Sequence, residues 1–309
     1  MSGSKKLKFQ QTLIPFLLLA FKRSSSLQQV QEWVEQHKFH TNWETIEWQG
    51  WRLPATKEKH PWCGIWNTIG CVKEQLHKML GKGNRVYVKH FQRFCYRACC
   101  KECYPRWIVR LANNSTKRIE KYSHIHNKKS IHLFLCPPPS QYHLPIEILQ
   151  KRAMGIIKKA QIEGGAIILH PFRFKENVRL FCPGPHFHLV CFGTEDKIRS
   201  AFGMYGWFIK DCHERRSVFQ TFCYLLSHCG VKNDKHALKW FGKLSYNKFK
   251  VEKEPKNNKC PVCKNKFVHI FHKGIQAIIQ PDKMYEGLLD SDGKWYETKE
   301  DPRKFVKDV

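Results

Sequence analysis

Two histidines separated by one residue, His186 and His188 in "CPGPHFHLVCFG" (residues 182–193), are the first side chains whose type and spacing suggest chemistry. Successive side chains of a β-strand alternate between its faces, so the two imidazoles point the same way. Together they can bind one metal ion through one nitrogen each. By itself such a pair is more often an ordinary feature of a solvated strand face. The metal interpretation therefore depends on what lies nearby.

The segment "ERRSVFQTFCYLLSHCG" (residues 214–230) supplies the neighbours. At about 100° per residue it predicts a helix with one apolar stripe facing the core. The apolar stripe consists of Val218, Phe222, Leu225 and Cys229. A narrow band on the opposite side of the helix consists of Ser217, Thr221, Tyr224 and His228. Tyr224 and His228 are one turn apart, so their side chains are neighbours. A half-exposed tyrosine and a surface histidine would explain the band; the functional alternative is a hydroxyl held beside a metal, with His228 as the third ligand.

A tyrosine needs such a metal if it is to act as a nucleophile. Its pKa of about 10 keeps the hydroxyl protonated at neutral pH. It attacks phosphorus readily only when a cation polarises the phosphodiester and the groups are in line. A site with three protein ligands leaves open positions for phosphate oxygens. This pairing suits DNA cleavage through a covalent phosphotyrosine.

The ordered motifs resemble those of a known family. "PHFHLVCF" resembles the His-hydrophobic-His motif of the HUH endonucleases, and Tyr224 follows His188 by 36 residues, on a helix, as their nucleophile does. The wider pattern "GGAIILHPFRF…GPHFHLV…YLLSHCGV…HALKWFGKLSYNK" is similar to rolling-circle replication initiators of archaeal plasmids and viruses, over roughly residues 62–265. The strand-like "SIHLFLCPPP" stands where the family's first motif would.

The resemblance implies a fold, an activity and cofactors. It implies an antiparallel sheet of the ferredoxin or RRM-like type and catalysis with Mg²⁺ or Mn²⁺. The tyrosine would nick one strand at a replication origin, stay joined to the 5′ phosphate, release a 3′-OH that primes a polymerase, and later rejoin the strand. The chain has no phosphate-binding Gly-x-x-x-x-Gly-Lys-Ser/Thr loop, so strand separation would require a host helicase.

Carried over by residue, the resemblance makes His186 and His188 metal ligands and Tyr224 the nucleophile. For the third ligand His228 is preferred, with His170 and Glu176 as alternatives. Two further positions can be compared with the family pattern: Ser227 stands where bacterial initiators have a lysine, and Tyr246 is a possible auxiliary. Among the basic residues, Arg173 is singled out as a candidate DNA contact because it lies just after His170 and Pro171, near the expected site.

The cysteines indicate structural zinc. Cys100 and Cys103 have the spacing of a zinc knuckle, and Cys71 and Cys95 are the preferred partners for a tetrahedral site, with Cys63 and Cys99 as alternatives. Cys260 and Cys263 form a second half-site, which His269 and His272 are close enough to complete. Clustered cysteines of this kind suit metal better than disulfides and favour a reducing, cytoplasmic compartment.

Composition points to a nucleic-acid partner. The 309 residues contain 54 Lys and Arg against 26 Asp and Glu, a net charge of +28. A field of this sign favours a polyanion, and interleaved aromatic residues suit base stacking on single-stranded DNA. The apolar run at residues 13–21 contains Pro15 and is too short to cross a bilayer, so a buried helix is expected there and a secretion signal is the alternative. No membrane partner is expected.

The element pattern predicts an α+β protein. From residue 130 to 230 it indicates strand, helix, strand, strand, helix, hence an antiparallel sheet with helices on one face. The expected divisions are an N-terminal region of unknown role, a Cys-rich zinc-binding module, the HUH endonuclease domain, and a C-terminal linker with a small Cys/His zinc module and tail, at residues 1–60, 61–122, 123–250 and 251–309. Alternatives to the nickase are an inactive zinc-containing DNA-binding regulator and an HUH transposase or relaxase.

Overall fold

The computed structural model describes residues 41–61, 63–211, 217–233, 235–252, 258–272 and 286–298, together with Glu32, Glu35, Gln36 and Lys38. The chain divides into two compact units, each built from two separate stretches of sequence. The larger unit contains residues 1–58 and 97–251, and the smaller unit contains residues 59–96 and 252–309. Both are mixed α+β structures with antiparallel sheets, as the sequence predicts at this level of detail. The apolar run at residues 13–21 lies outside the described residues.

The larger unit is organised around a five-stranded antiparallel sheet with the order β8-β5-β7-β6-β9. Its strands are β5 (Ile131–Cys136), β6 (Gly164–Lys175), β7 (Leu180–Phe192), β8 (Phe208–Asp211) and β9 (Leu238–Gly242). β6 and β7 are the long central pair and run through the middle of the sheet. A short hairpin of β1 (Glu47–Trp48) and β2 (Trp51–Arg52) adds the buried side chain of Trp51 to the core.

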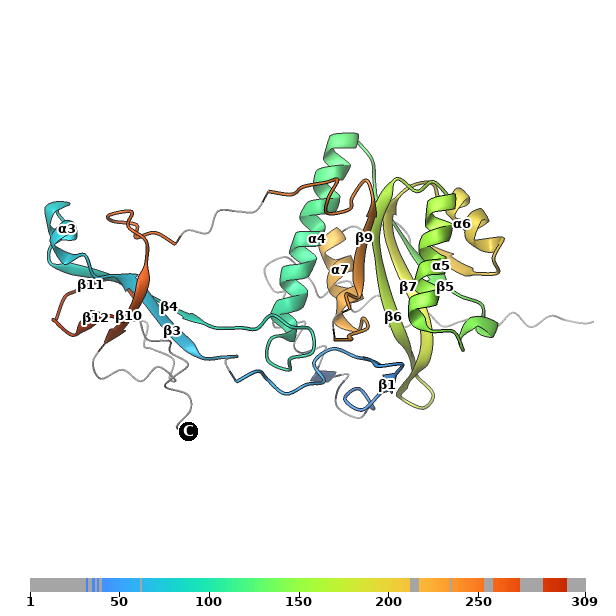
Figure 1. Cartoon of the computed structure of the whole chain (residues 1–309), viewed down its shortest axis with the longest axis horizontal. Helices are drawn as coiled ribbons and strands as arrows, with labels where there is room; N and C mark the ends of the chain where they lie inside the picture. The colour runs from blue at the N-terminus through green and yellow to red at the C-terminus, as the bar shows by residue number, and fades with distance from the viewer. Residues whose placement is uncertain are drawn as a thin grey trace, which may run out of the picture. The chain divides into compact units, whose positions relative to one another are not determined.

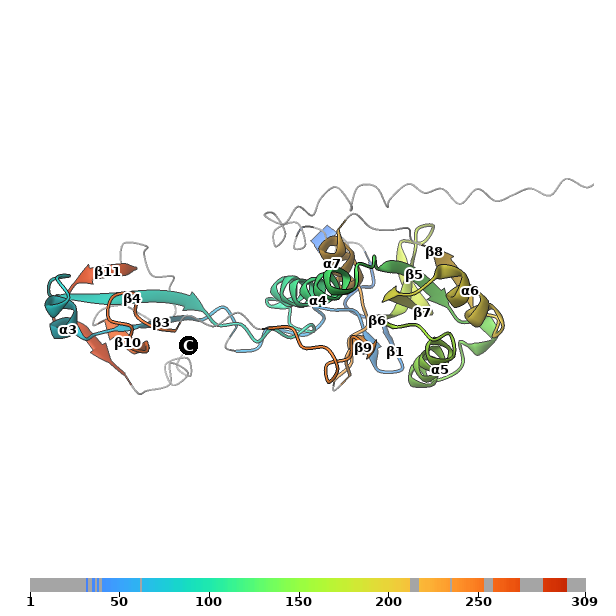
Figure 2. The same ribbon diagram turned by 90° about the horizontal axis from the view of Figure 1, so that it is seen from above.

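Helices cover both faces of this sheet, whereas the sequence analysis expected them on one face. α4 (Tyr104–His126) and α7 (Val218–Ser227) cover one face, and α5 (Ile146–Lys159) and α6 (Glu195–Gly203) cover the other (Figures 1 and 2). The reason lies in β6: Ile168 faces the core under α4 and α7, while Ile167 faces the core under α5 and α6. A strand buried on both faces needs apolar residues at successive positions, which the run "AIIL" provides.

The helix α4 belongs to the larger unit and not to a separate Cys-rich module. It begins after Cys103 and ends at His126, and its C-cap residue Asn127 has a left-handed backbone with φ 47°. Its buried side chains pack against α7 and the sheet, among them Ile108 and Ile119. Residues 41–58 also join this unit, where Trp43 is fully buried and its indole donates a hydrogen bond to the carbonyl of Pro54. The predicted boundaries at residues 60 and 122 therefore do not match the division seen in the structure.

The smaller unit is a second five-stranded antiparallel sheet, with the order β11-β4-β3-β10-β12. Its elements are β3 (Trp66–Cys71), the helix α3 (Glu74–Met79), β4 (Arg85–Gln92), β10 (Val268–His272), β11 (Gly287–Asp290) and β12 (Trp295–Glu297). Its described core is small and consists of Val86, Val88, Ile270 and Trp295. The sequence analysis put these strands into two modules, but β3 pairs with β10, so the two stretches of sequence form one sheet.

Gly70 permits this pairing. A Cβ atom at this position would lie 2.2 Å from the carbonyl oxygen of Tyr87 and 2.4 Å from Cδ1 of Ile270. No larger residue fits between these neighbours without moving the backbone.

Within the described part of the chain, no helix has the combination of length and apolarity needed to cross a bilayer.

Candidate functional site

Three buried histidines meet on the face of the larger sheet that α4 and α7 cover. His170 on β6 lies directly opposite His186 on β7, and His188 follows two residues along the same face. Their exposed fractions are 0%, 6% and 5%, and one ring nitrogen from each lies within 4.8 Å of the other two. A register shift between His170 and Phe172 interrupts the ladder beside them. Such bulges re-aim side chains and are frequent next to functional sites.

Hydrogen bonds to backbone carbonyls fix which nitrogen of His170 and of His186 carries a proton. Nε2 of His170 lies 2.8 Å from the carbonyl oxygen of Leu225, and Nδ1 of His186 lies 2.9 Å from that of Gly184. A carbonyl only accepts, so each of these nitrogens donates. The other nitrogens, Nδ1 of His170 and Nε2 of His186, then carry the lone pairs. Nδ1 of His170 is buried with no hydrogen-bond partner. A buried acceptor left in this way is what a metal ligand requires.

His132 on β5 extends the group. Its Nε2 lies 3.0 Å from Nδ1 of His188, and the two rings are 5.1 Å apart between centroids. The contact orients the His188 ring as an outer hydrogen-bond partner does at a metal site. The sequence analysis did not select His132, although its position on the predicted strand at residues 130–136 was a usable signal. Phe134 lies directly opposite His188, so His132 shares that face.

The environment keeps the three imidazoles neutral. Burial lowers the pKa of His186 to about 3, with the nearby Arg173 charge adding to the effect. Burial also holds the pKa values of His170 and His188 well below the ordinary range, and the neighbouring histidines lower them further. Neutral imidazole is the form that binds a metal ion. The site is therefore ready to accept a cation at neutral pH.

The structure places His170 in this group, and His228, the preferred third ligand, outside it. α7 ends at Ser227, and His228 caps it with a non-helical backbone. Its ring stands next to the group, 4.3 Å from the His170 ring between centroids. The other alternative, Glu176, is exposed in the turn after β6 and does not join the described group. His170 joins His186 and His188 because the pairing register of β6 and β7 places it directly opposite His186.

Tyr224 lies on α7, part-buried against the core under that helix. Its ring is 4.9 Å from the His228 ring, as their one-turn spacing predicts. His228 in turn contacts His170, so a continuous series of ring contacts connects the tyrosine with the three histidines. Tyr246 differs: it is 63% exposed, and its ring packs under the guanidinium of Arg118.

Arg173 lies beside the group at the far side of the bulge. Its Nη2 donates a hydrogen bond to Sγ of Cys136 at 2.7 Å, and its guanidinium lies 5.4 Å from the Phe134 ring centroid. Its Nε is buried without a hydrogen-bond partner. Its charge also lowers the pKa of His186, although less than burial does. The sequence-based choice of Arg173 thus falls on the cation next to the histidines.

The cysteines are grouped differently from the expectation. Cys71, which the sequence analysis paired with Cys95, Cys100 and Cys103, lies instead with Cys260, Cys263 and His77 in the smaller unit. The cause is the pairing of β3 with β10, which brings the two stretches of that unit together. Cys100 and Cys103 lie at the start of α4 in the larger unit, with their thiols within 4.8 Å of each other.

Two other expectations about cysteine partners can be compared with the structure. Cys95 and Cys63 lie within the smaller unit, and their thiols are within 4.8 Å of each other. His269 and His272 do not complete the Cys260 half-site; Nε2 of His272 lies 3.0 Å from a carboxylate oxygen of Asp292. The cysteine groups can hold a metal such as zinc, as the sequence predicts, but Cys71 and the Cys260 half-site have other partners than those expected.

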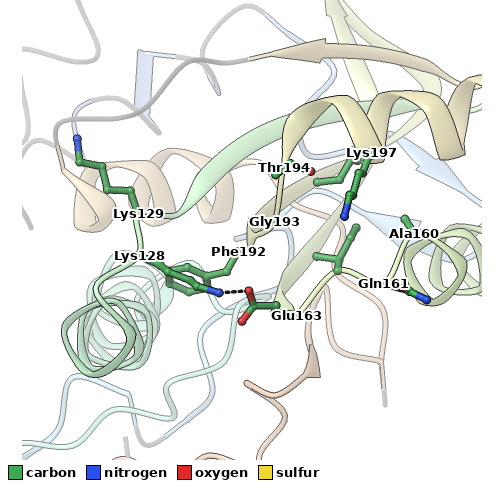
Figure 3. A pocket seen from close by; sticks show the side chains of 11 residues that line it. Lys128, Lys129, Ala160, Gln161, Glu163, Phe192, Gly193, Thr194 and Lys197 are labelled. Atoms are coloured by element: carbon green, nitrogen blue, oxygen red, sulfur yellow. Dashed lines mark hydrogen bonds and ion pairs between the residues drawn. The ribbon is translucent and has the colours of Figure 1, made fainter.

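A hollow at the opposite end of β6 and β7 is the alternative location for a functional site. Lys128, Lys129 and Lys197 line it around Glu163 (Figure 3). Glu163 is seven residues before His170, which corresponds to about 23 Å along an extended strand. Lys128 pairs with the Glu163 carboxylate, which also accepts a hydrogen bond from the hydroxyl of Tyr122 at 3.0 Å. Because the Glu163 carboxylate already has these partners, we assign Glu163 a structural role.

Glu163 gives a stability prediction. Its hydrogen bond from Lys128 lowers its pKa to about 2, against partial burial, and Tyr122 adds to the effect. A carboxyl with a depressed folded-state pKa stabilises the fold above its unfolded pKa, and this contribution is lost as the pH falls toward about 2. Because the groups are part-exposed, Glu163→Gln should lower the free energy of unfolding by only about 1 kcal/mol at pH 7. Urea denaturation at pH 7, 4 and 3 should show this difference shrinking below about pH 4.5, the ordinary pKa of the carboxyl.

The matched control is Glu195→Gln, since Glu195 forms an exposed pair with Arg199 one turn away on α6. Such helix-surface pairs contribute only about 0.3–0.5 kcal/mol. A Glu163→Gln effect that stays constant with pH would contradict the assignment.

Neither a family model, nor a curated protein, nor a solved structure matches this chain. What the protein does must therefore be inferred from the chemistry of the site.

Proposed function

We propose that the larger unit is a metal-dependent DNA nickase and strand transferase that initiates rolling-circle replication. One observation carries the proposal. Three buried, neutral histidines meet on one sheet face, one with an unpartnered Nδ1, beneath the helix that bears Tyr224. The motif resemblance supplies the reaction type, and the charge of +28 suits a DNA substrate.

The donor set favours one of the two expected ions. His170, His186 and His188 offer three imidazole nitrogens and no carboxylate. Mg²⁺ prefers oxygen ligands, whereas first-row transition ions bind imidazole with an affinity that rises from Mn²⁺ through Co²⁺ to Ni²⁺. The residues therefore fit Mn²⁺ better than Mg²⁺. A bound ion of this kind would polarise the scissile phosphate and offset its negative charge.

The remaining chemistry falls to the chain's own side chains. Oη of Tyr224 forms a bond to phosphorus while the bond from phosphorus to the 3′ oxygen breaks. The Tyr224 proton must leave, and the ring contact with His228 supports His228 as its first acceptor. The proton then passes to the departing 3′ oxygen, which leaves as a 3′-OH. The 5′ phosphate remains on Tyr224, and the reverse reaction rejoins the strand.

Arg173 is the cation best suited to hold the phosphate backbone near the histidines, because its guanidinium lies beside His186 and Nε is unpartnered. The released 3′-OH would be extended by a host DNA polymerase. The missing phosphate-binding loop makes a host helicase the partner that separates the strands.

The direct test is capture of the covalent intermediate. The full chain is incubated with Mn²⁺ and a pool of single-stranded oligonucleotides with randomised sequence, and the adduct is mapped by mass spectrometry. A 5′-phosphotyrosine on Tyr224 supports the proposal. DNA binding without an adduct on any substrate would favour the inactive regulator. Adducts formed preferentially on element ends or transfer origins would favour a transposase or relaxase.

The ion preference is a separate prediction. Half-maximal adduct formation should require a concentration of Mn²⁺ roughly tenfold lower than of Mg²⁺, since imidazole nitrogens bind the transition ion better. The measurement is the initial rate of adduct formation against ion concentration, at constant ionic strength. Equal requirements for the two ions would show that oxygen ligands outside this group dominate binding.

A further inference from the structure

We infer that Cys71, His77, Cys260 and Cys263 form a structural zinc site that holds the smaller unit together. The four side chains come from both stretches of that unit: the first two from β3 and α3, the others from the segment before β10. One donor atom of each lies within 4.8 Å of the other three. This inference is independent of the proposed nickase activity.

The distances match a tetrahedral metal and not a disulfide. Sγ of Cys71 and Sγ of Cys263 are 3.5 Å apart, and Nε2 of His77 is 3.3 Å from Sγ of Cys263 and 3.4 Å from Sγ of Cys260. Zinc bonds of about 2.3 Å to sulfur and about 2.0 Å to nitrogen give tetrahedron edges of about 3.8 Å between sulfurs and about 3.5 Å between sulfur and nitrogen. A disulfide would need about 2.05 Å.

The His77 ring is oriented for ligation. It is fully buried, and its Nδ1 lies 2.7 Å from the carbonyl oxygen of Arg85, to which it must donate. The lone pair is then on Nε2, the nitrogen that faces the sulfurs. A ligating histidine held by a backbone carbonyl through its other nitrogen is the usual arrangement at zinc. The sequence analysis overlooked His77 because five residues lie between it and Cys71, a spacing that matches no short zinc motif.

The turn "CPVCKN" forms the other half of the site. The backbone N–H of Lys264 donates to the carbonyl of Cys260 at 2.9 Å, and the N–H of Cys260 donates to the carbonyl of Asn265 at 2.7 Å. Lys264 has φ 60°, which closes the turn. The side-chain amide of Asn265 donates to Sγ of Cys263 at 3.3 Å.

Thiolate is the form of cysteine that binds zinc. Four protein ligands leave no open position for a substrate, so the site is structural and not catalytic.

The position in the fold explains why a metal is needed. Cys71 and Cys263 are 192 residues apart in the sequence, so this contact closes a very long loop. The described core of the smaller unit holds only Val86, Val88, Ile270 and Trp295. So small a core supplies little stability without a staple, and metal binding to a site absent from the unfolded chain adds directly to folding free energy.

The test uses the full chain. Metal content is measured by atomic emission after purification without added metal, for the parent protein and for Cys71→Ser and His77→Gln. Each variant should lose one equivalent of zinc relative to the parent. Cys191→Ala is the matched control, because Cys191 is a buried thiol of the larger sheet outside the described cysteine groups, and it should lose none.

Two further measurements, of which the second needs only the parent protein, guard against variants that fail to fold. Replacement of zinc by Co²⁺ should give a thiolate-to-cobalt charge-transfer band, and Cys71→Ser should reduce it. Chelation should increase hydrogen exchange at β3, β4 and β10 by at least about tenfold while β6 and β7 stay protected. Unchanged zinc content in both variants, or unchanged exchange at β3 and β10 after chelation, would overturn the inference. Neither result depends on DNA cleavage, so these experiments test the zinc site independently of the proposed nickase activity.

Discussion

Tyr224→Phe is expected to abolish the covalent protein–DNA adduct, with a loss of at least about 10⁴-fold in the rate of its formation. The substitution removes only the hydroxyl oxygen, which is the atom that bonds to phosphorus. The ring remains, and with it the contacts to His228 and to the core under α7. Single-stranded DNA binding should therefore change by less than about threefold, which separates loss of the nucleophile from loss of the fold. The measurement is single-turnover adduct formation on the oligonucleotide that the parent protein cleaves.

The matched control is Tyr246→Phe. Tyr246 belongs to the same unit but is exposed, and its ring contacts Arg118, so its hydroxyl should be dispensable. An adduct that persists in Tyr224→Phe and disappears in Tyr246→Phe would show that the nucleophile was assigned to the wrong tyrosine. Persistence in both variants would rule out both hydroxyls.

Local periodicity revealed half of the histidine site. His186 and His188 follow from the alternation of side chains along one strand, and the Tyr224–His228 contact follows from one turn of helix. His170 was only an alternative, because its position depends on the register between two strands. Register is set by the whole ladder, and here also by the bulge after His170. No spacing along the chain carries that information.

The same limit explains the cysteines. The spacing of Cys260 and Cys263 predicts a half-site correctly, but its partners are about 190 residues away and are brought together by the β3–β10 pairing. A sequence contains no local signal for such a contact. The two-sided helix layer is different, because the uninterrupted apolar run at residues 166–169 is typical of strands buried on both faces. Helices on both faces of the sheet could therefore have been predicted from the sequence.

The second large effect concerns the third ligand. His170→Gln should weaken Mn²⁺ binding to the larger unit by at least about 100-fold, because it removes one of three imidazoles. The glutamine amide can still donate to the carbonyl of Leu225, so the contact between β6 and α7 is preserved. His228→Gln should weaken binding by less than about tenfold, since His228 contacts the His170 ring but lies outside the group of ligand atoms. The measurement is electron paramagnetic resonance of free Mn²⁺ in a titration.

The two histidines should also separate in kinetics. With Mn²⁺ at a concentration that saturates the parent, His170→Gln should regain adduct formation when more Mn²⁺ is added, because the defect is in binding. His228→Gln should not, because its contact with Tyr224 suits a proton acceptor, and added metal does not replace a base. The opposite pattern, with His228→Gln rescued by Mn²⁺ and His170→Gln indifferent to it, would make His228 the ligand.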